Sequence, residues 1–250
     1  MNLHFVYVVD KSDQRSIWTS VVNDDEYRIG TLLPEDVVVD IGMHTGSFCA
    51  RAFIAGSRRI YGFEADEDNC RLALANVGGM AQIHHIAVTR SDARKTDPVF
   101  YSGHIPMEHE LNTGVGNVFA PSGTPVETLD FDDILGQLGP TRLVKMDCEG
   151  SEWPILYTAS RLLNVAEFVG EWHLTMRPGF AQEMGLPPCD LNTLRAHMEK
   201  EGFLCRFYAR TEDMPSPIVG NFRFVRERKA SRDGFARDLD GRQIVCGSAF

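Results

Sequence analysis

One short stretch of the chain combines an acid with two glycines in a spacing typical of a nucleotide-binding turn. Asp40 closes a run of apolar, β-branched residues, and Gly42 and Gly46 follow it, four positions apart. This pattern predicts a buried strand, a tight turn and the first turn of a helix. Glycine lets the backbone turn sharply and keeps a Cβ atom out of a ligand's path, and the first N–H groups of a helix lack partners within it. The stretch therefore indicates a ligand-binding turn.

A second acid, Glu64, ends the next apolar run, Ile60–Phe63. An acid at the end of the second strand of a βαβ unit is well placed to accept hydrogen bonds from a ribose diol. A nicotinamide or flavin site needs a glycine in the middle of the first turn, where this chain has His44. A carboxylate at Asp40 would oppose a diphosphate, but it suits the amino group of a methionine moiety. The pattern therefore favours S-adenosylmethionine.

This interpretation gives the individual residues distinct expected contacts. Asp40 would face the amino-acid end of the cofactor, the glycines would admit it, and Glu64 would take the ribose hydroxyls. His84 and His85 lie in the third expected strand, Ala81–Val88, close to where adenine packs in this fold. Either of them, with His85 taken as the candidate, is expected to border the adenine ring, and a surface histidine without a ligand is the alternative. The full set of expected cofactor-binding residues is Asp40, Gly42, His44, Gly46, Glu64, Ala65, His85 and Asp147.

Acids and a histidine also follow two later strands. Asp147 and Glu149 come after the apolar run that begins at Leu143, and Glu171 and His173 end another. Methyl transfer from S-adenosylmethionine is an in-line displacement, which needs the acceptor atom held behind the methyl carbon and any proton on that atom removed. A histidine has the pKa range of a general base, and a nearby carboxylate orients its ring. We therefore predict His173 as the base, with Glu171 or Asp147 beside it.

Two alternatives stay open for this group. Glu171 and His173 could simply hold the cluster together, with proximity alone driving transfer. Asp147, Glu149, Glu171 and His173 could instead hold a divalent cation, since carboxylate oxygens and an imidazole are suitable ligands. A second possible metal cluster, His104, Glu108, His109 and Glu110, lies in a loop-rich stretch with no recognised ligand spacing, where a solvated polar loop is the favoured interpretation. We assign no metal ligand.

The elements that position these residues alternate along the chain. Strands ending near Asp40, Glu64, Val88, Asp147 and His173 are separated by helical stretches. Such alternation predicts a doubly wound, Rossmann-like sheet of the α/β class, mostly parallel, with helices on both faces. The runs Phe203–Tyr208 and Asn221–Val225 then predict an antiparallel C-terminal strand pair.

We expect a single methyltransferase domain over residues 1–250, in three parts. Residues 1–26 form an N-terminal elaboration, in which Leu3–Val9 and Ser16–Val22 predict a β-hairpin. Residues 27–175 form the cofactor-binding core, and residues 176–250 the C-terminal strands and tail. A stretch rich in glycine and proline, Thr89–Pro125, predicts a long loop insertion.

Composition limits the partners and the compartment. The 250-residue chain carries a net charge of −10, which repels phosphate backbones and argues against sequence-independent nucleic-acid binding. No apolar run reaches the roughly 18 residues of a membrane span, and the first ten residues lack the features of a secretory signal. The six cysteines are scattered without a CxxC pair, which predicts reduced thiols in a cytoplasmic protein.

Several blocks together resemble the FkbM-type family of S-adenosylmethionine-dependent methyltransferases. They are Val38–Gly46, Tyr61–Ala65, Ala87-Val88, Val126–Asp130 and Leu143–Trp153, and Glu171-Trp172-His173 resembles the family's Glu-x-His. The similarity covers about residues 27 to 175 and is most specific at Lys-x-Asp-x-Glu-Gly-x-Glu, which begins at Lys145. The family usually has asparagine where this chain has His44.

The resemblance implies O-methylation of a hydroxyl, often on a sugar, glycolipid or polyketide-type small molecule. We therefore expect a small-molecule or glycan acceptor, no nucleic-acid partner and no membrane span, and we leave the oligomeric state open. Two other functions remain to be tested. One is a non-catalytic cofactor-binding protein on the same fold, and the other is a nicotinamide-dependent oxidoreductase, which His44 disfavours.

Overall fold

The structure is a computed structural model of the chain. It describes residues 12–92, 100–101, 106–107, 110–111, 124–174, 178–209, 219–227, 235–237 and 243–245. The expected hairpin arm Leu3–Val9 lies outside the described residues. No helix among the described residues is both long enough and apolar enough to cross a membrane.

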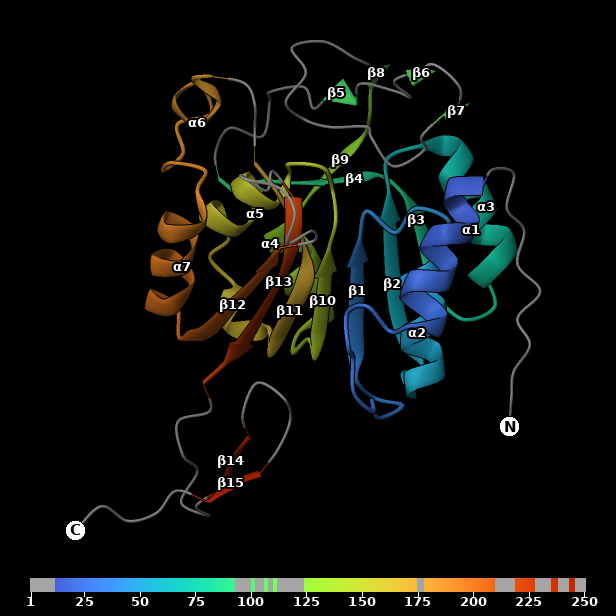
Figure 1. Cartoon of the computed structure of the whole chain (residues 1–250), viewed down its shortest axis with the longest axis horizontal. Helices are drawn as coiled ribbons and strands as arrows, with labels where there is room; N and C mark the ends of the chain where they lie inside the picture. Colours follow the sequence, from blue (N-terminus) through green and yellow to red (C-terminus); the bar gives the residue numbers. More distant parts are fainter. Residues whose placement is uncertain are drawn as a thin grey trace.

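A seven-stranded sheet forms the centre of the molecule, in the order β12-β13-β11-β10-β1-β2-β3 (Figure 1). Its strands are β1 Val37–Ile41, β2 Arg59–Glu64, β3 Gln82–His85, β10 Leu143–Met146, β11 Glu167–His173, β12 Phe203–Ala209 and β13 Val219–Arg226. The first five named run parallel, and β13 pairs antiparallel with both β11 and β12. The predicted mostly parallel sheet with an antiparallel C-terminal pair is confirmed.

Strand order creates a switch point in this sheet. The chain passes from β1 to β2 on one side and returns to β10 on the other, and ligands of open α/β sheets bind outside the carboxyl ends of the strands at such a point. Because β11 lies next to β10, the acids that end β1, β10 and β11 meet at one edge.

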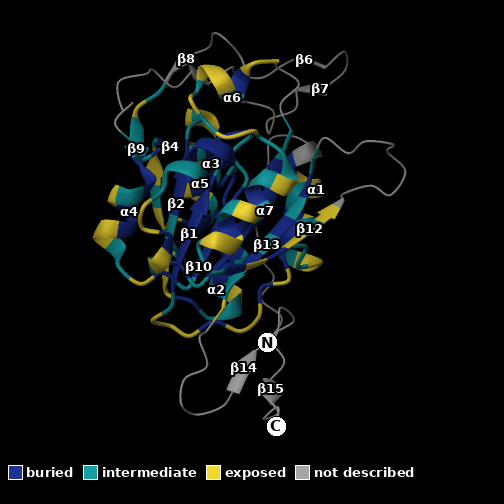
Figure 2. Cartoon of the chain, turned by 90° about the vertical axis from the view of Figure 1, so that its left-hand side faces the viewer, coloured by how far each residue is buried: buried dark blue, intermediate teal, exposed yellow. Residues whose placement is uncertain are grey.

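Helices cover both faces of the sheet. They are α1 Ser12–Trp18, the π-helix η1 Thr19–Asn23, α2 Ser47–Ala55, α3 Glu67–Val77, α4 Phe131–Leu138, α5 Glu152–Thr158, the 3-10 helix η2 Leu162–Asn164, α6 Phe180–Glu183 and α7 Leu191–Lys200. Strand side chains alternate between faces, so Val39 joins the core under α4, α5 and α7, and Val38 joins the core under α1, α2 and α3. Figure 2 shows the buried strands between helices whose outer surfaces are exposed.

In the part of the chain that the structure describes, four further strand pairs form separate two-stranded sheets. They are β4 Ala87–Thr89 with β9 Thr128–Asp130, β5 Phe100–Tyr101 with β8 Thr124–Pro125, β6 Pro106–Met107 with β7 Glu110–Leu111, and β14 Phe235–Arg237 with β15 Gln243–Val245. The expected third strand, Ala81–Val88, is divided into β3 and β4. The division follows from two backbone hydrogen bonds: Ile86 N–H still donates to Glu64, whereas Ala87 N–H donates to Glu127.

The predicted N-terminal hairpin is wrong for its second arm, because Ser16–Val22 lies in α1 and η1. The β-branched residues there suggested a strand, but tertiary packing overrides such a preference. Trp18 is 1% exposed, and its indole N–H donates to the Thr45 hydroxyl at 2.9 Å. The helical backbone places this ring in the core, where it packs with residues of α2.

Aspartate side chains cap the starts of two helices. The Asp66 side chain accepts the Asn69 N–H at the start of α3. Asp190 accepts the N–H groups of Asn192 and Thr193 at the start of α7. Such caps satisfy N–H groups that the helix cannot.

Candidate functional site

The turn between β1 and α2 has the backbone that its glycines predicted. Gly42 and Gly46 have φ values of 70° and 91°. A Cβ on Gly42 would lie 1.9 Å from the Asp147 carbonyl oxygen, and one on Gly46 would lie 2.6 Å from a methyl of Val77. The protein's own close packing therefore requires both glycines, which brings the β1 turn against the turn that follows β10.

His44 occupies the middle of this turn in the left-handed region, with a φ of 54°. Its N–H donates to Oε2 of Glu64 at 2.7 Å, and Oε1 of Glu64 accepts the Asp66 N–H at 2.9 Å. Asparagine and histidine are among the non-glycine residues that tolerate this conformation best, which accounts for the type of residue found here.

Glu64 is thus held between the ends of β1 and β2, and it is 7% exposed. Burial raises the pKa of its carboxyl to about 7, against the opposing effect of the hydrogen bonds from Asp66 and His44. Next to it, the His85 ring lies 3.1 Å from the Ala65 carbonyl oxygen, at the exposed end of β3. The expected ribose and adenine contacts Glu64, Ala65 and His85 therefore lie together.

Asp40 lies deeper than expected, with no exposed surface. Its carboxylate forms an ion pair with Lys145, Nζ lying 3.2 Å from Oδ1, and accepts a hydrogen bond from the Cys49 thiol. Burial raises the pKa of Asp40 in spite of Lys145. Lys145 also donates to the Gly42 carbonyl oxygen at 2.6 Å and lies 3.9 Å from Asp147. This lysine, to which the sequence analysis assigned no role, links Asp40 to the rest of the site.

The acids that end β10 and β11 surround one imidazole. The Nε2 atom of His173 lies 3.4 Å from Glu149, 3.8 Å from Glu171 and 4.0 Å from Asp147. Burial alone would lower the pKa of His173, but the surrounding carboxylates, Glu152 foremost, raise it to about 10. The imidazole therefore carries a proton at neutral pH. The structure brings together Asp147, Glu171 and His173, the three predicted catalytic residues.

Glu152, at the first position of α5, also contacts this imidazole, with Oε1 3.2 Å from Nδ1 of His173. The same carboxylate accepts the N–H groups of Cys148 and Gly150, each at 2.8 Å. The Trp153 indole donates to the His173 carbonyl oxygen at 2.6 Å. The start of α5 thus fixes both the ring and the backbone of His173. In the sequence, the only indication of a role for Glu152 is that it is the last residue of the block Lys-x-Asp-x-Glu-Gly-x-Glu.

The group could also hold a cation. One ligand atom each from Asp147, Glu149 and His173 lie within 4.8 Å of one another, and this donor set suits a divalent ion. A cation there would have to displace the proton that His173 carries, because an imidazole ligand must be neutral.

Tyr27 closes one side of the site. It is 7% exposed, and its hydroxyl lies 3.5 Å from Oδ2 of Asp147. Burial first, and then the charge of Asp147, raise the pKa of the phenol. Tyr27 lies in a turn with Glu26, and the segment that follows has no regular secondary structure and packs through Ile29 and Leu32.

Comparisons with known proteins complete this description. The family model for the methyltransferase FkbM domain matches residues 40–205. No curated protein matches the chain. A crystal structure of methyltransferase FkbM from Methylobacillus flagellatus is 15% identical with a TM-score of 0.46, over 82% of this chain and 47% of that one. The chain thus spans about half the length of that protein.

Other solved structures match at similar levels. The precorrin-6y C5,15-methyltransferase from Geobacter metallireducens is 14% identical, with a TM-score of 0.40, over 90% of this chain and 95% of that one. An rRNA methylase from Streptococcus thermophilus is 10% identical, with a TM-score of 0.42, over 88% and 99%. The family match is the informative one, because it covers about two thirds of the chain. The chain belongs to the FkbM family of S-adenosylmethionine-dependent methyltransferases.

Proposed function

We propose that this methyltransferase transfers the methyl group of S-adenosylmethionine to a hydroxyl of a small molecule, sugar or glycolipid. The observation that carries the proposal is the group of carboxylates around His173, at the strand ends beside the β1 turn. Hydroxyl methylation releases a proton, and this group offers places for it.

The cofactor would lie along the edge formed by the ends of β1, β2 and β3. The residues that would contact the cofactor, through side chains or backbone, are Gly42, His44, Gly46, Glu64, Ala65 and His85, and Asp147 would contact its amino-acid end. Asp40 is fully buried, so we assign it an indirect part: it holds Lys145 in place below Asp147. S-adenosylmethionine supplies the electrophilic methyl group when bound.

Proton removal follows from the protonation state of the group. His173 has a pKa of about 10, so at neutral pH its imidazole is already charged. We propose that Asp147, whose side chain is 28% exposed, accepts the acceptor's proton. His173 and Glu171 then orient the carboxylates around Asp147, and the positive charge of His173 offsets the negative charge of these carboxylates. General-base catalysis by His173 itself requires the neutral imidazole and stays a prediction. The pH dependence of the methyl-transfer rate distinguishes it from proton transfer to Asp147.

The acceptor class rests on charge. The net charge is −10, and the reaction centre itself is rich in carboxylates, both of which disfavour a phosphodiester backbone. The fold alone does not decide this, since an rRNA methylase shares it. We therefore propose a small acceptor rather than RNA.

A transfer assay tests the proposal. The enzyme is incubated with methyl-labelled S-adenosylmethionine and, separately, with sugar, glycolipid and polyketide alcohols and with total RNA. We expect label on a small-molecule oxygen, and none after Asp147→Asn. Label in RNA alone would refute the acceptor class, and binding of NAD without binding of S-adenosylhomocysteine would refute the cofactor assignment.

Two further expectations remain proposals. The described cysteines Cys49, Cys70, Cys148, Cys189 and Cys205 are free, which supports a reducing, cytoplasmic compartment. We also propose that residues 1–250 form one domain, with residues 27–175 as its cofactor-binding core.

A further inference from the structure

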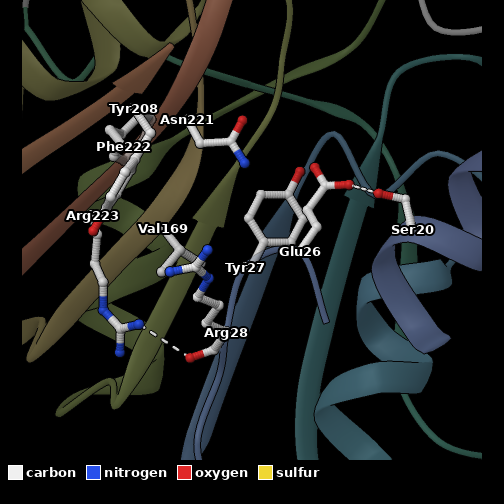
Figure 3. A pocket seen from close by; sticks show the side chains of 9 residues that line it. All are labelled: Ser20, Glu26, Tyr27, Arg28, Val169, Tyr208, Asn221, Phe222 and Arg223. Carbon is white, nitrogen blue, oxygen red and sulfur yellow. Dashed lines mark hydrogen bonds between the residues drawn. The ribbon is translucent and has the colours of Figure 1, made fainter. Parts of the chain in front are cut away.

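A cavity of about 320 Å³ lies on the sheet face beside Tyr27 (Figure 3). Its floor comes from β11, β13 and β12, through Val169, Asn221, Arg223 and Tyr208, and its wall comes from the segment that carries Tyr27 and Arg28. The volume falls in the range of small-molecule sites.

The cavity adjoins the reaction centre. Tyr27 lines it with its ring, and the hydroxyl of Tyr27 contacts Asp147. Asn221 is the direct cross-strand partner of Glu171, and side chains so paired lie on the same face about 5 Å apart. A ligand in the cavity would therefore lie against Tyr27 and Asn221, next to the carboxylates around His173.

Two guanidinium groups face this cavity. Arg28 makes no side-chain hydrogen bond or ion pair with any residue that the structure describes. Arg223 pairs through one nitrogen with Glu167 and donates through another to the Arg28 carbonyl oxygen. The one carboxylate in the lining, Glu26, accepts a hydrogen bond from Ser20. The positive charge of Arg28 is thus left for a ligand.

Arg28 is also held in an unusual backbone conformation, with a φ of 49°. Its N–H donates to the Asp25 carbonyl oxygen at 2.7 Å, and Asp25 is anchored by an ion pair with Arg51 at 2.7 Å. Strained backbone of this kind persists where the surroundings fix it, and here it aims an exposed arginine along the cavity wall (Figure 3).

Two buried polar atoms in the lining also lack hydrogen-bond partners among the described residues. They are the side-chain oxygen of Asn221 and the Nε–H group of Arg223. An unpaired buried acceptor and an unpaired buried donor are costly. Both atoms are fully covered by neighbouring protein atoms, so they are not direct contacts for a ligand in the cavity.

We infer that this cavity binds the anionic part of the methyl acceptor, a carboxylate or phosphate carried on a hydroxylated, sugar-sized molecule. The inference rests on the proposed function. Across β11 and β13, Asn221 pairs with Glu171 and Arg223 pairs with Val169. The side chains of Asn221 and Arg223 therefore lie about 7 Å apart along β13. The reacting hydroxyl then lies near Asp147, and the anionic group lies against Arg28 and Arg223, roughly one sugar ring away.

The test compares pyranoses that differ in one group. The whole protein, loaded with S-adenosylhomocysteine, is titrated calorimetrically with glucose, glucuronate, glucose 6-phosphate and inorganic phosphate. We expect one or both anionic sugars to bind at least about tenfold more tightly than glucose, the factor that one charge-assisted hydrogen bond supplies. Glucuronate as the tighter ligand identifies a carboxylate, and glucose 6-phosphate identifies a phosphate.

Arg28→Gln should reduce the affinity for the preferred anionic sugar about tenfold and leave that for glucose unchanged. The matched control is Arg59→Gln, because Arg59 is an exposed arginine at the opposite end of β2, and it should change neither affinity. Equal affinity for charged and neutral sugars, tighter binding of phosphate alone, or an equal loss in both variants overturns the inference. S-adenosylhomocysteine binding and the transfer assay separate this outcome from failure of the proposed function, which would appear as no cofactor binding in the wild type or as label in RNA alone.

Discussion

The carboxylate of Glu152 and the imidazole of His173 lie 3.2 Å apart, joining the start of α5 to the end of β11. Glu152 is 1% exposed and also holds the turn after β10 through two backbone N–H groups. One side chain therefore shapes the turn, orients the ring and is the foremost of the carboxylates that raise the pKa of His173.

Glu152→Gln should lower the pKa of His173 and reduce the pH dependence of stability. The folded pKa of about 10 exceeds the usual 6.5. The contribution to stability is therefore complete below about pH 6.5 and is lost as the pH rises through 10. Urea unfolding at pH 7 and pH 10 should show a smaller decrease for Glu152→Gln than for wild type. The exposed Glu35→Gln control should behave as wild type, and identical decreases in all three proteins would contradict the assignment.

Glu64 should make cofactor affinity depend on pH. Its pKa of about 7 means that the carboxylate, the form proposed to accept the ribose hydroxyls, is the minor form at pH 6. The affinity for S-adenosylhomocysteine should therefore be about tenfold higher at pH 8 than at pH 6. Calorimetry on Glu64→Gln should give weaker binding at pH 8 and little change between the two pH values. A variant that keeps the wild-type pH dependence would show that another group is responsible.

Lys145 should be essential for stability because it compensates Asp40. Removing one partner of a buried ion pair leaves an uncompensated charge and costs about 3–5 kcal/mol. Lys145→Met should therefore lower the free energy of unfolding by about this amount. In the wild type, Asp40 and Asp147 raise the pKa of Lys145 above its usual value, although burial acts in the opposite direction. The double variant with Asp40→Asn should recover part of the loss in the same denaturation experiment. A fully stable single variant would refute the role.

Much of the fold could be predicted because local patterns and local structure agree. The strand, turn and helix over Val37–Ala55 follow from an apolar run, two glycines and a helix start. The antiparallel pair β12 and β13 likewise follows from two β-rich runs. The hairpin expected at Ser16–Val22 was wrong because the burial of Trp18, which no local pattern reveals, decides the backbone there.

The site was predictable only in part, for a related reason. Asp40, Glu64, Asp147 and His173 were found because acids and a histidine at strand ends are visible along the chain. Lys145 was missed because its partner belongs to a strand more than 100 residues earlier in the sequence. The cavity was missed because Arg28 and Arg223, which meet there, are 195 residues apart.

The most direct test of the proposed chemistry is the pH dependence of methyl transfer, measured as single turnovers at saturating cofactor and acceptor. If Asp147 accepts the proton beside a charged His173, the rate should stay nearly constant from pH 7 to pH 9 and fall only as the pH passes about 10. A rate that rises about tenfold per pH unit across the same range would contradict this account, because it would show that the neutral imidazole of His173 is the base.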